Sequence, residues 1–180
     1  MKSTEVLVHE HQIIWMVLDA AERKAQQIEA QGAAGVQGVD QMVDFFQSFA
    51  DRCHHAKEED LLFVRMEERG VCVDGGPIGV MLREHEEGRR RVRAVAAALP
   101  GAAEGDPEAL AAVSGNLKAY VQLLRAHILK EDRALYPMAD KLFTPQDQEE
   151  MSEAFDRVEA EEIGEGVHER YHELAHQLAG

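Results

Sequence analysis

Two stretches of the sequence, 73 residues apart, carry the same arrangement of histidine, lysine and glutamate. The first reads H-H-A-K-E-E-D-L-L-F-V from His54, and the second reads H-I-L-K-E-D-R-A-L-Y-P from His127. In each, a glutamate follows four residues later, Glu58 and Glu131, so the two side chains lie one turn apart on one face of a helix. The chain must therefore fold in a way that exposes these two polar faces or pairs them inside.

A shorter motif precedes each stretch. Glu10-His11 lies upstream of the first stretch, and Glu84-His85 lies upstream of the second. The chain therefore has the pattern of two helical hairpins of similar design. Each hairpin offers one histidine from its first helix and a His-x-x-x-Glu pair from its second.

The rest of the sequence favours helices throughout. Ala, Leu, Glu, Gln and Arg dominate, and alternating β-branched runs are absent. Clusters of glycine and proline end the expected helices, which span residues 4–31, 39–68, 78–99 and 107–142. Pro107 suits a first-turn position.

These lengths predict an all-α fold with two parts. Residues 1–143 are expected to form an antiparallel up-down-up-down four-helix bundle, with residues 144–180 as a C-terminal helical extension packed on it. Thr144 is a good N-cap before Pro145. Gly164 and Gly166 are expected to interrupt this extension before a last helix that ends near residue 178.

Helical periodicity indicates which side chains face the bundle interior. At ~100° per residue, His54 lies about 80° from the core position Phe46, and His55 lies about 180° from it. We therefore expect His54 and Glu58 to face inward and His55 to face away. Glu131 falls among the apolar residues of its helix, where an unpaired carboxylate would be costly without a cation.

A metal site accounts for these polar residues better than a solvated helix face does. A lone histidine is more often a surface or satisfied core residue, and one His-x-x-x-Glu pair is common on charged helices. The repeated pattern favours four neutral nitrogens and two carboxylates that converge on two iron or manganese ions. The candidate ligands are His11, His54, Glu58, His85, His127 and Glu131. Asp132 suits the role less well.

The set of motifs resembles the hemerythrin-like family, also called the HHE cation-binding domain. The matching segments are E-H-Q-I-I around His11, H-H-A-K-E-E-D-L-L-F from His54, R-E-H-E-E-G-R around His85 and H-I-L-K-E-D-R-A-L-Y-P from His127. The resemblance covers residues 5–142 and implies a four-helix bundle with a non-haem diiron site. It implies that the six candidate residues are iron ligands, with Glu58 and Glu131 as bridges beside an oxo or hydroxo group. Manganese and zinc accept the same ligands.

One position departs from the oxygen carriers of that family. Those proteins have two histidines four residues apart on the third helix, whereas here Met81 stands four residues before His85. One iron would then have a nitrogen ligand fewer, unless a replacement comes from elsewhere, including the tail. This departure favours redox chemistry, NO binding or peroxide turnover over reversible oxygen carriage.

The tail carries its own histidines. His168, His172 and His176 share one helical stripe beside Glu165, Glu169 and Glu173. A charged helix with i, i+4 stripes is the simpler interpretation. The alternative is that His168 or His172 caps the bundle and reaches the diiron site.

Composition narrows the function classes. The net charge of −15 argues against nucleic-acid or anionic-membrane binding. No apolar run approaches the ~18 residues of a membrane span, no signal peptide is visible, and the two cysteines show no CxxC spacing. We expect a cytoplasmic monomer or homodimer that binds or reacts with a small diatomic or peroxide ligand (O2, NO or peroxide), with enzymatic peroxide or NO consumption left open. The alternatives are iron storage or donation, iron-centre repair, an oxygen or iron sensor, and a metal-free interaction module.

Overall fold

Helices make up almost all of the chain. The computed structural model describes residues 2–163 and 166–180, and this part of the chain contains no strand. The predicted all-α class is therefore confirmed. Gly164 and Glu165 lie outside the described residues, whereas Gly166 has a positive φ of 78° and is the N-cap of the last helix, as expected of a break.

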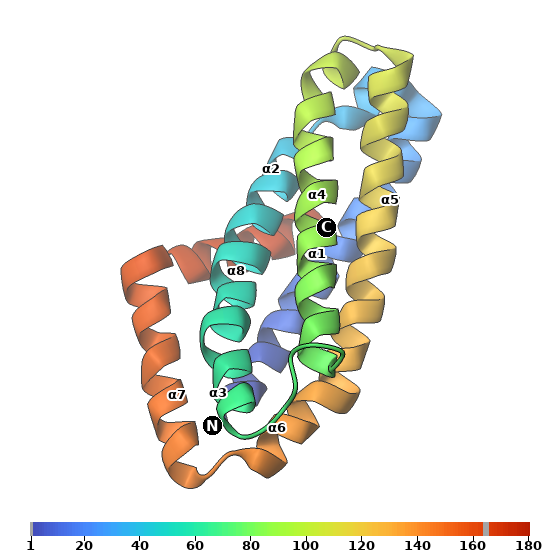
Figure 1. The fold of residues 1–180 in the computed structure, drawn as a ribbon. Helices are drawn as coiled ribbons and strands as arrows, with labels where there is room; N and C mark the ends of the chain where they lie inside the picture. Colours follow the sequence, from blue (N-terminus) through green and yellow to red (C-terminus); the bar gives the residue numbers. More distant parts are fainter. Residues whose placement is uncertain (1, 164–165) are drawn as a thin grey trace.

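Four long helical rods lie side by side (Figure 1). The first rod is α1 (Ser3–Gln31), which is followed by a short 3-10 turn, η1 (Gly32–Val36); the second comprises α2 (Val39–Phe45), η2 (Phe46–His55), η3 (Glu58–Leu62) and α3 (Phe63–Glu68); the third is α4 (Pro77–Ala103); the fourth comprises α5 (Pro107–Lys130), η4 (Glu131–Leu135) and α6 (Tyr136–Leu142). α5 packs against α4 and α1, and α2 contacts both α4 and α1. The up-down-up-down order and the division at residue 143 stay predictions.

Two of the rods change from α-helical to π-helical backbone where the His-x-x-x-Glu motifs lie. η2 and η3 are π-helical in the second rod, and η4 is π-helical in the fourth. A π-turn holds more residues than an α-turn, so each residue advances by less than ~100°. His54 and His55 are consequently both buried, at 1% and 3% exposure. The prediction that His55 faces away is wrong, because it assumed α-helical geometry.

Side chains cap the starts of α5 and α7, and α4 ends later than predicted. The Asp106 side chain accepts from two backbone N–H groups at the start of α5, and Thr144 forms a capping box with Asp147, as its sequence position predicted. The third helix was expected to end at residue 99, but α4 continues to Ala103 through Pro100. Pro100 has no N–H to donate to the carbonyl four residues earlier, but it stands within the last turn, so only one helical hydrogen bond near the end of α4 is lost.

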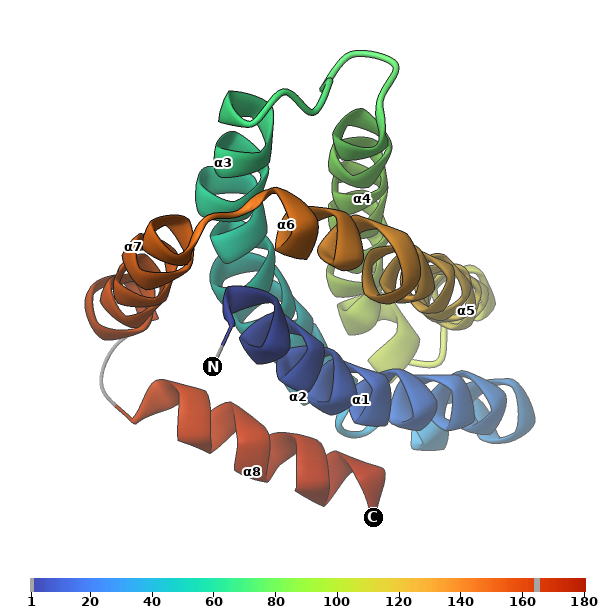
Figure 2. The ribbon, with the colours of Figure 1, turned by 90° about the horizontal axis from the view of Figure 1, so that it is seen from below.

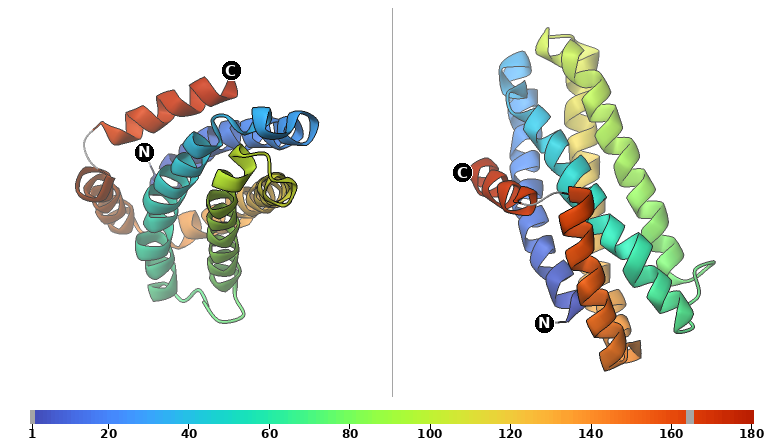
Figure 3. Two further views of the ribbon diagram at one scale, coloured as in Figure 1. Left: turned by 90° about the horizontal axis from the view of Figure 1, so that it is seen from above. Right: turned by 90° about the vertical axis from the view of Figure 1, so that its left-hand side faces the viewer.

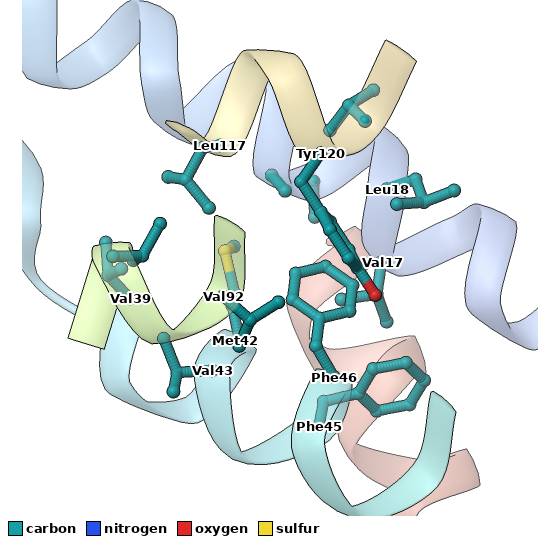
Figure 4. Close-up of a cluster of buried hydrophobic side chains, with 14 of the residues drawn as sticks. Val17, Leu18, Val39, Met42, Val43, Phe45, Phe46, Val92, Leu117 and Tyr120 are labelled. Carbon is teal, nitrogen blue, oxygen red and sulfur yellow. The ribbon is translucent and has the colours of Figure 1, made fainter. Parts of the chain in front are cut away.

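The apolar core has two parts with the motif residues between them. The larger part lies toward the η1 end and includes the Phe46 and Tyr120 rings, whose centroids are 4.6 Å apart (Figure 4). The smaller part, at the other end, includes Leu7, Leu62 and Leu135. On every rod, the motif histidines and glutamates fall close to the boundary between the two parts, which creates a polar layer across the bundle.

The C-terminal segment runs outside the four rods. It consists of α7 (Pro145–Arg157), η5 (Val158–Ile163) and α8 (Val167–Ala179). α8 lies across α1, and α7 runs beside the second rod (Figures 2 and 3). In α7, the buried Asp147 carboxylate accepts from Arg69 at 2.7 Å and also from Arg65. Among the described residues, no helix is long and apolar enough to cross a membrane.

Candidate metal centre

The six candidate ligands are all buried in the polar layer. Their exposed fractions are between 0% and 2%. Each of the four rods contributes, because the histidine of each hairpin's first helix faces the His-x-x-x-Glu pair of its second. The structure thus brings together every side chain that the repeated motifs selected, and their role as ligands stays a prediction.

The two glutamates lie between histidines of different helices. Glu131 Oε1 is 3.0 Å from His127 Nε2, and its Oε2 is 3.3 Å from His11 Nε2. Glu58 Oε2 is 3.4 Å from His85 Nε2 and 3.6 Å from His54 Nε2. Each carboxylate therefore faces imidazoles from both halves of the chain, as a bridging ligand would.

The side chains form two adjoining groups, here called position A and position B. Position A comprises His11, His54, Glu58 and Glu131, and position B comprises His55, Glu58, His85 and His127. Within each group, one potential ligand atom of every residue lies within 4.8 Å of the others. Glu58 belongs to both groups, and each group could hold a metal ion.

Several buried carboxylate oxygens in this layer have no hydrogen-bond partner. Glu58 Oε2 and both carboxylate oxygens of Glu131 are fully buried and accept no hydrogen bond. Buried polar atoms are rarely left without a partner, and a buried carboxylate without one is expensive. Imidazole and carboxylate donors suit iron, manganese or zinc, so these buried residues fit a pair of such ions.

A second layer of carboxylates orients the four motif histidines through their Nδ1 atoms. The Nδ1 of His11 lies 2.7 Å from Asp132, that of His54 2.9 Å from Glu10, that of His85 2.6 Å from Glu59, and that of His127 2.8 Å from Glu84. Such carboxylate–histidine pairs leave Nε2 as the nitrogen that could bind a metal and raise its basicity. Asp132 therefore acts behind His11 rather than as a member of either group.

These carboxylates were visible in the sequence, although their roles were not. Each one is the neighbour of a candidate ligand: Glu10 precedes His11, Glu84 precedes His85, Glu59 follows Glu58 and Asp132 follows Glu131. Each orients a histidine on a different helix. The repeated acidic neighbour is thus a signal for this second layer, but its partner becomes clear only from the packing of the helices.

Two lysines complete the repeat and differ in exposure. Lys57 Nζ donates to Glu10 at 2.5 Å, and Lys130 Nζ donates to Glu84. The Lys57 side chain is fully buried, whereas the Lys130 side chain is 41% exposed. The difference arises from the tail, because Glu159 of η5 also accepts from Lys57.

The tail histidines approach this second layer rather than the two positions. His168 Nε2 lies 3.5 Å from Glu10 Oε1. Together with Glu159, these two residues form a third group of potential metal ligands, besides positions A and B. The Lys57 ammonium contacts the carboxylates of both Glu10 and Glu159 and thus occupies the place where a cation would bind. His172 stacks on His9 with centroids 5.4 Å apart. Neither His168 nor His172 belongs to position A or B.

The charges of the layer shift the ionisation of its members. Burial alone would lower the pKa of His127, but Glu131 and Glu84 outweigh burial and raise that pKa to about 10. For His11, Asp132 and Glu131 likewise outweigh burial and raise the pKa to about 9. Metal ligands must be deprotonated, so a metal ion would compete with these protons.

Tyr136 brings a hydroxyl group to position A. Its Oη donates to Glu58 Oε1 at 2.6 Å and lies 3.2 Å from His11 Nε2. Burial and the nearby carboxylates Glu131 and Glu58 raise the pKa of Tyr136 well above its usual range, so the phenol keeps its proton. A lone tyrosine in the sequence gives no signal of such contacts.

His55 is the second residue that the sequence interpretation missed. It is buried, and its ring stacks on that of His85 with centroids 3.8 Å apart. Burial, followed by the neighbouring His85, lowers the pKa of His55 well below its usual value, which keeps the imidazole neutral. In the sequence, the only sign that His55 belongs to the polar layer is that it directly follows His54.

Comparison with known proteins points to one family. The Hemerythrin HHE cation binding domain model matches residues 2–139. Uncharacterized proteins of Mycobacterium bovis and Mycobacterium tuberculosis are 23% identical over 161 residues, which is 89% of this chain and 62% of theirs. The chain thus spans less than two thirds of the length of these relatives. No solved structure gives a significant match.

Proposed function

Because the chain belongs to the hemerythrin HHE cation-binding family, we propose that its polar layer holds two iron ions and that the centre binds or reacts with O2, NO or peroxide. The observation that carries this proposal is the group of buried, unpartnered oxygens on Glu58 and Glu131. Two irons, when bound, would supply redox chemistry and an open coordination position for a small molecule. The chain's own residues would hold the ions and control their surroundings.

The ligand roles follow from the distances between the side chains. Glu131 has one oxygen toward His127 and the other toward His11, and Glu58 is shared by positions A and B. We propose these two carboxylates as bridges. The imidazoles would bind through Nε2, because their Nδ1 atoms are held by the second-layer carboxylates.

The apolar surroundings favour a small uncharged reactant. The layer lies between two hydrophobic clusters, and its six candidate ligands are at most 2% exposed. Large substrates cannot reach ligands this deeply buried, whereas a diatomic molecule or peroxide is small enough to enter. Tyr136 Oη, which keeps its proton, is placed to donate a hydrogen bond on the side of position A.

The buried ligands also bear on the main alternative, iron storage or donation. A protein that releases iron readily needs ligands that solvent or an acceptor can reach. Here all six lie behind the second layer of carboxylates, which favours a retained cofactor over a transferable one. Slow loss of iron to a chelator is expected, and rapid complete loss would favour the donor function.

Rapid mixing tests the reactivity. Protein loaded with ferrous iron without air is mixed separately with O2, NO and hydrogen peroxide, and its visible spectrum is followed. At least one of them should change the spectrum in the wild type, and the Glu131→Ala variant, loaded in parallel, should not respond in the same way. A loaded wild-type protein that is inert to all three would contradict the proposed reactivity.

A further inference from the structure

A fifth buried histidine lies beside the four that the repeated motifs supply. The His55 ring is 3.8 Å from the His85 ring and nearly parallel to it, and its centroid is 6.0 Å from that of His127. One of its ring nitrogens falls within the group that defines position B. His55 therefore shares this position with two predicted metal ligands.

The surroundings of His55 resemble those of the motif histidines. Its Nδ1 lies 3.3 Å from Asp51 Oδ1, so a carboxylate stands behind it as well. Arg89 donates to Asp51 at 2.8 Å and to Glu59 at 2.7 Å, and Glu59 is the carboxylate behind His85. A single guanidinium group thus aligns the carboxylates that orient both histidines, and it leaves the Nε2 atom of His55 free.

The other half of the chain has no counterpart of this arrangement. The 73-residue offset between the His-x-x-x-Glu helices pairs His55 with Ile128 and Asp51 with Leu124. The Glu-His motifs are 74 residues apart (85 − 11), and this offset pairs Arg89 with Trp15. All three polar residues on the side of position B therefore correspond to apolar residues on the side of position A. A histidine that served only packing would not need this polar set behind it.

We infer that His55 is a metal ligand at position B, which then has three imidazoles, whereas position A has two. The inference rests on the proposed two-metal function. It identifies the source of the nitrogen that Met81 fails to supply on the third helix. The two metal ions would then be chemically different, with the three-imidazole ion near Arg89 and the two-imidazole ion near Tyr136.

A purely structural role for His55 is the competing explanation. His55 also lines a surface pocket of about 210 Å³ together with Arg89, Gly88 and Tyr120, so it could serve as a wall of that pocket. As a wall, it could be replaced by another side chain of similar size without an effect on metal binding. If His55 is a ligand, its loss would weaken the binding of one of the two metal ions and leave the other ion in place.

The test compares His55→Ile, which installs the residue of the other half, with Ile128→Val as the matched control. Both variants and the wild type are loaded with ferrous iron, and iron per chain is followed during incubation with a chelator, with Mössbauer spectra of the loaded samples. His55→Ile should lose one of its two irons at least about tenfold faster than the control, and the Mössbauer signal of one iron should change. Circular dichroism of the metal-free variants establishes that both fold.

A second variant keeps the inference testable if His55→Ile fails to fold. His55→Gly leaves a space that free imidazole can fill, and added imidazole should restore both slow iron loss and the wild-type Mössbauer signal. Wild-type iron retention and spectra in folded His55→Ile, or in His55→Gly without imidazole, would overturn the assignment. A wild type that binds no iron would instead refute the proposed function, so the two failures are distinguishable.

Discussion

Glu10 and Glu84 occupy equivalent places in the two halves of the protein. Glu10 Oε2 is 2.9 Å from His54 Nδ1, and Glu84 Oε2 is 2.8 Å from His127 Nδ1. Each also accepts from the lysine three residues after that histidine, Lys57 or Lys130. The internal repeat therefore encodes the carboxylates that orient the ligands as well as the ligands themselves.

Neutralising either carboxylate should weaken metal binding. In Glu10→Gln and Glu84→Gln, the histidine loses its charged partner, and affinity for one metal ion should fall by about 10- to 100-fold. Competition with a chelator of known affinity measures this change. The control is Glu29→Gln, which removes an exposed carboxylate that pairs with Lys118. Equal affinities in all three variants would show that these carboxylates do not tune the centre.

The two lysines should differ in their contribution to stability. Lys57→Met leaves Glu10 buried without its main cation and should lower the free energy of unfolding by about 3 kcal/mol. Lys130→Met removes a half-exposed partner of Glu84 and should cost about 1 kcal/mol or less. Urea denaturation of the metal-free variants checks both values. Similar losses for the two variants would contradict the role assigned to Glu159 in covering Lys57.

Tyr136→Phe should affect the metal-free protein more than the loaded one. Without the hydroxyl group, Glu58 loses its 2.6 Å hydrogen bond, which should cost about 1–3 kcal/mol while no metal compensates. Thermal unfolding with and without iron separates the two cases. Tyr171→Phe serves as the control, because it removes a 3.0 Å bond to Asp44 outside the metal centre and should act equally in both states. An equal loss in both states of Tyr136→Phe would argue against a place at the metal.

The two cysteines should react at very different rates. Burial raises the pKa of Cys53 to about 12, whereas Cys72 is exposed. A thiol reagent at neutral pH should modify one thiol per native chain and the second only after denaturation, since the thiolate is the reactive form. Cys72→Ser should abolish the fast reaction. Rapid modification of that variant would mean that the layer around Cys53 opens in solution.

Helical periodicity predicted the burial of the motif residues correctly, but it failed at His55. Glu131 was selected because it lies among apolar residues, and it is fully buried. His55 was rejected by α-helical arithmetic, which fails across η2 because the backbone there is π-helical. A π-helical segment has no reliable signature in a single sequence, so the sequence alone could not show that both histidines of the pair are buried.

Contacts between distant segments were the other limit. The acidic neighbours of the ligands were visible, but Glu10 orients His54 rather than its own neighbour His11 because of how the first two helices pack. The burial of Lys57 depends on Glu159, 102 residues away. Local spacing cannot reveal such pairs, because they depend on where the C-terminal segment crosses the bundle.

The most direct test of the two-metal account is the iron content of the wild type after anaerobic loading, measured with its visible and Mössbauer spectra. The account predicts about two irons per chain in two distinct environments, with Glu58→Ala and Glu131→Ala both impaired because each removes a carboxylate proposed as a bridge. A folded wild-type protein that stays colourless and iron-poor after loading would contradict it.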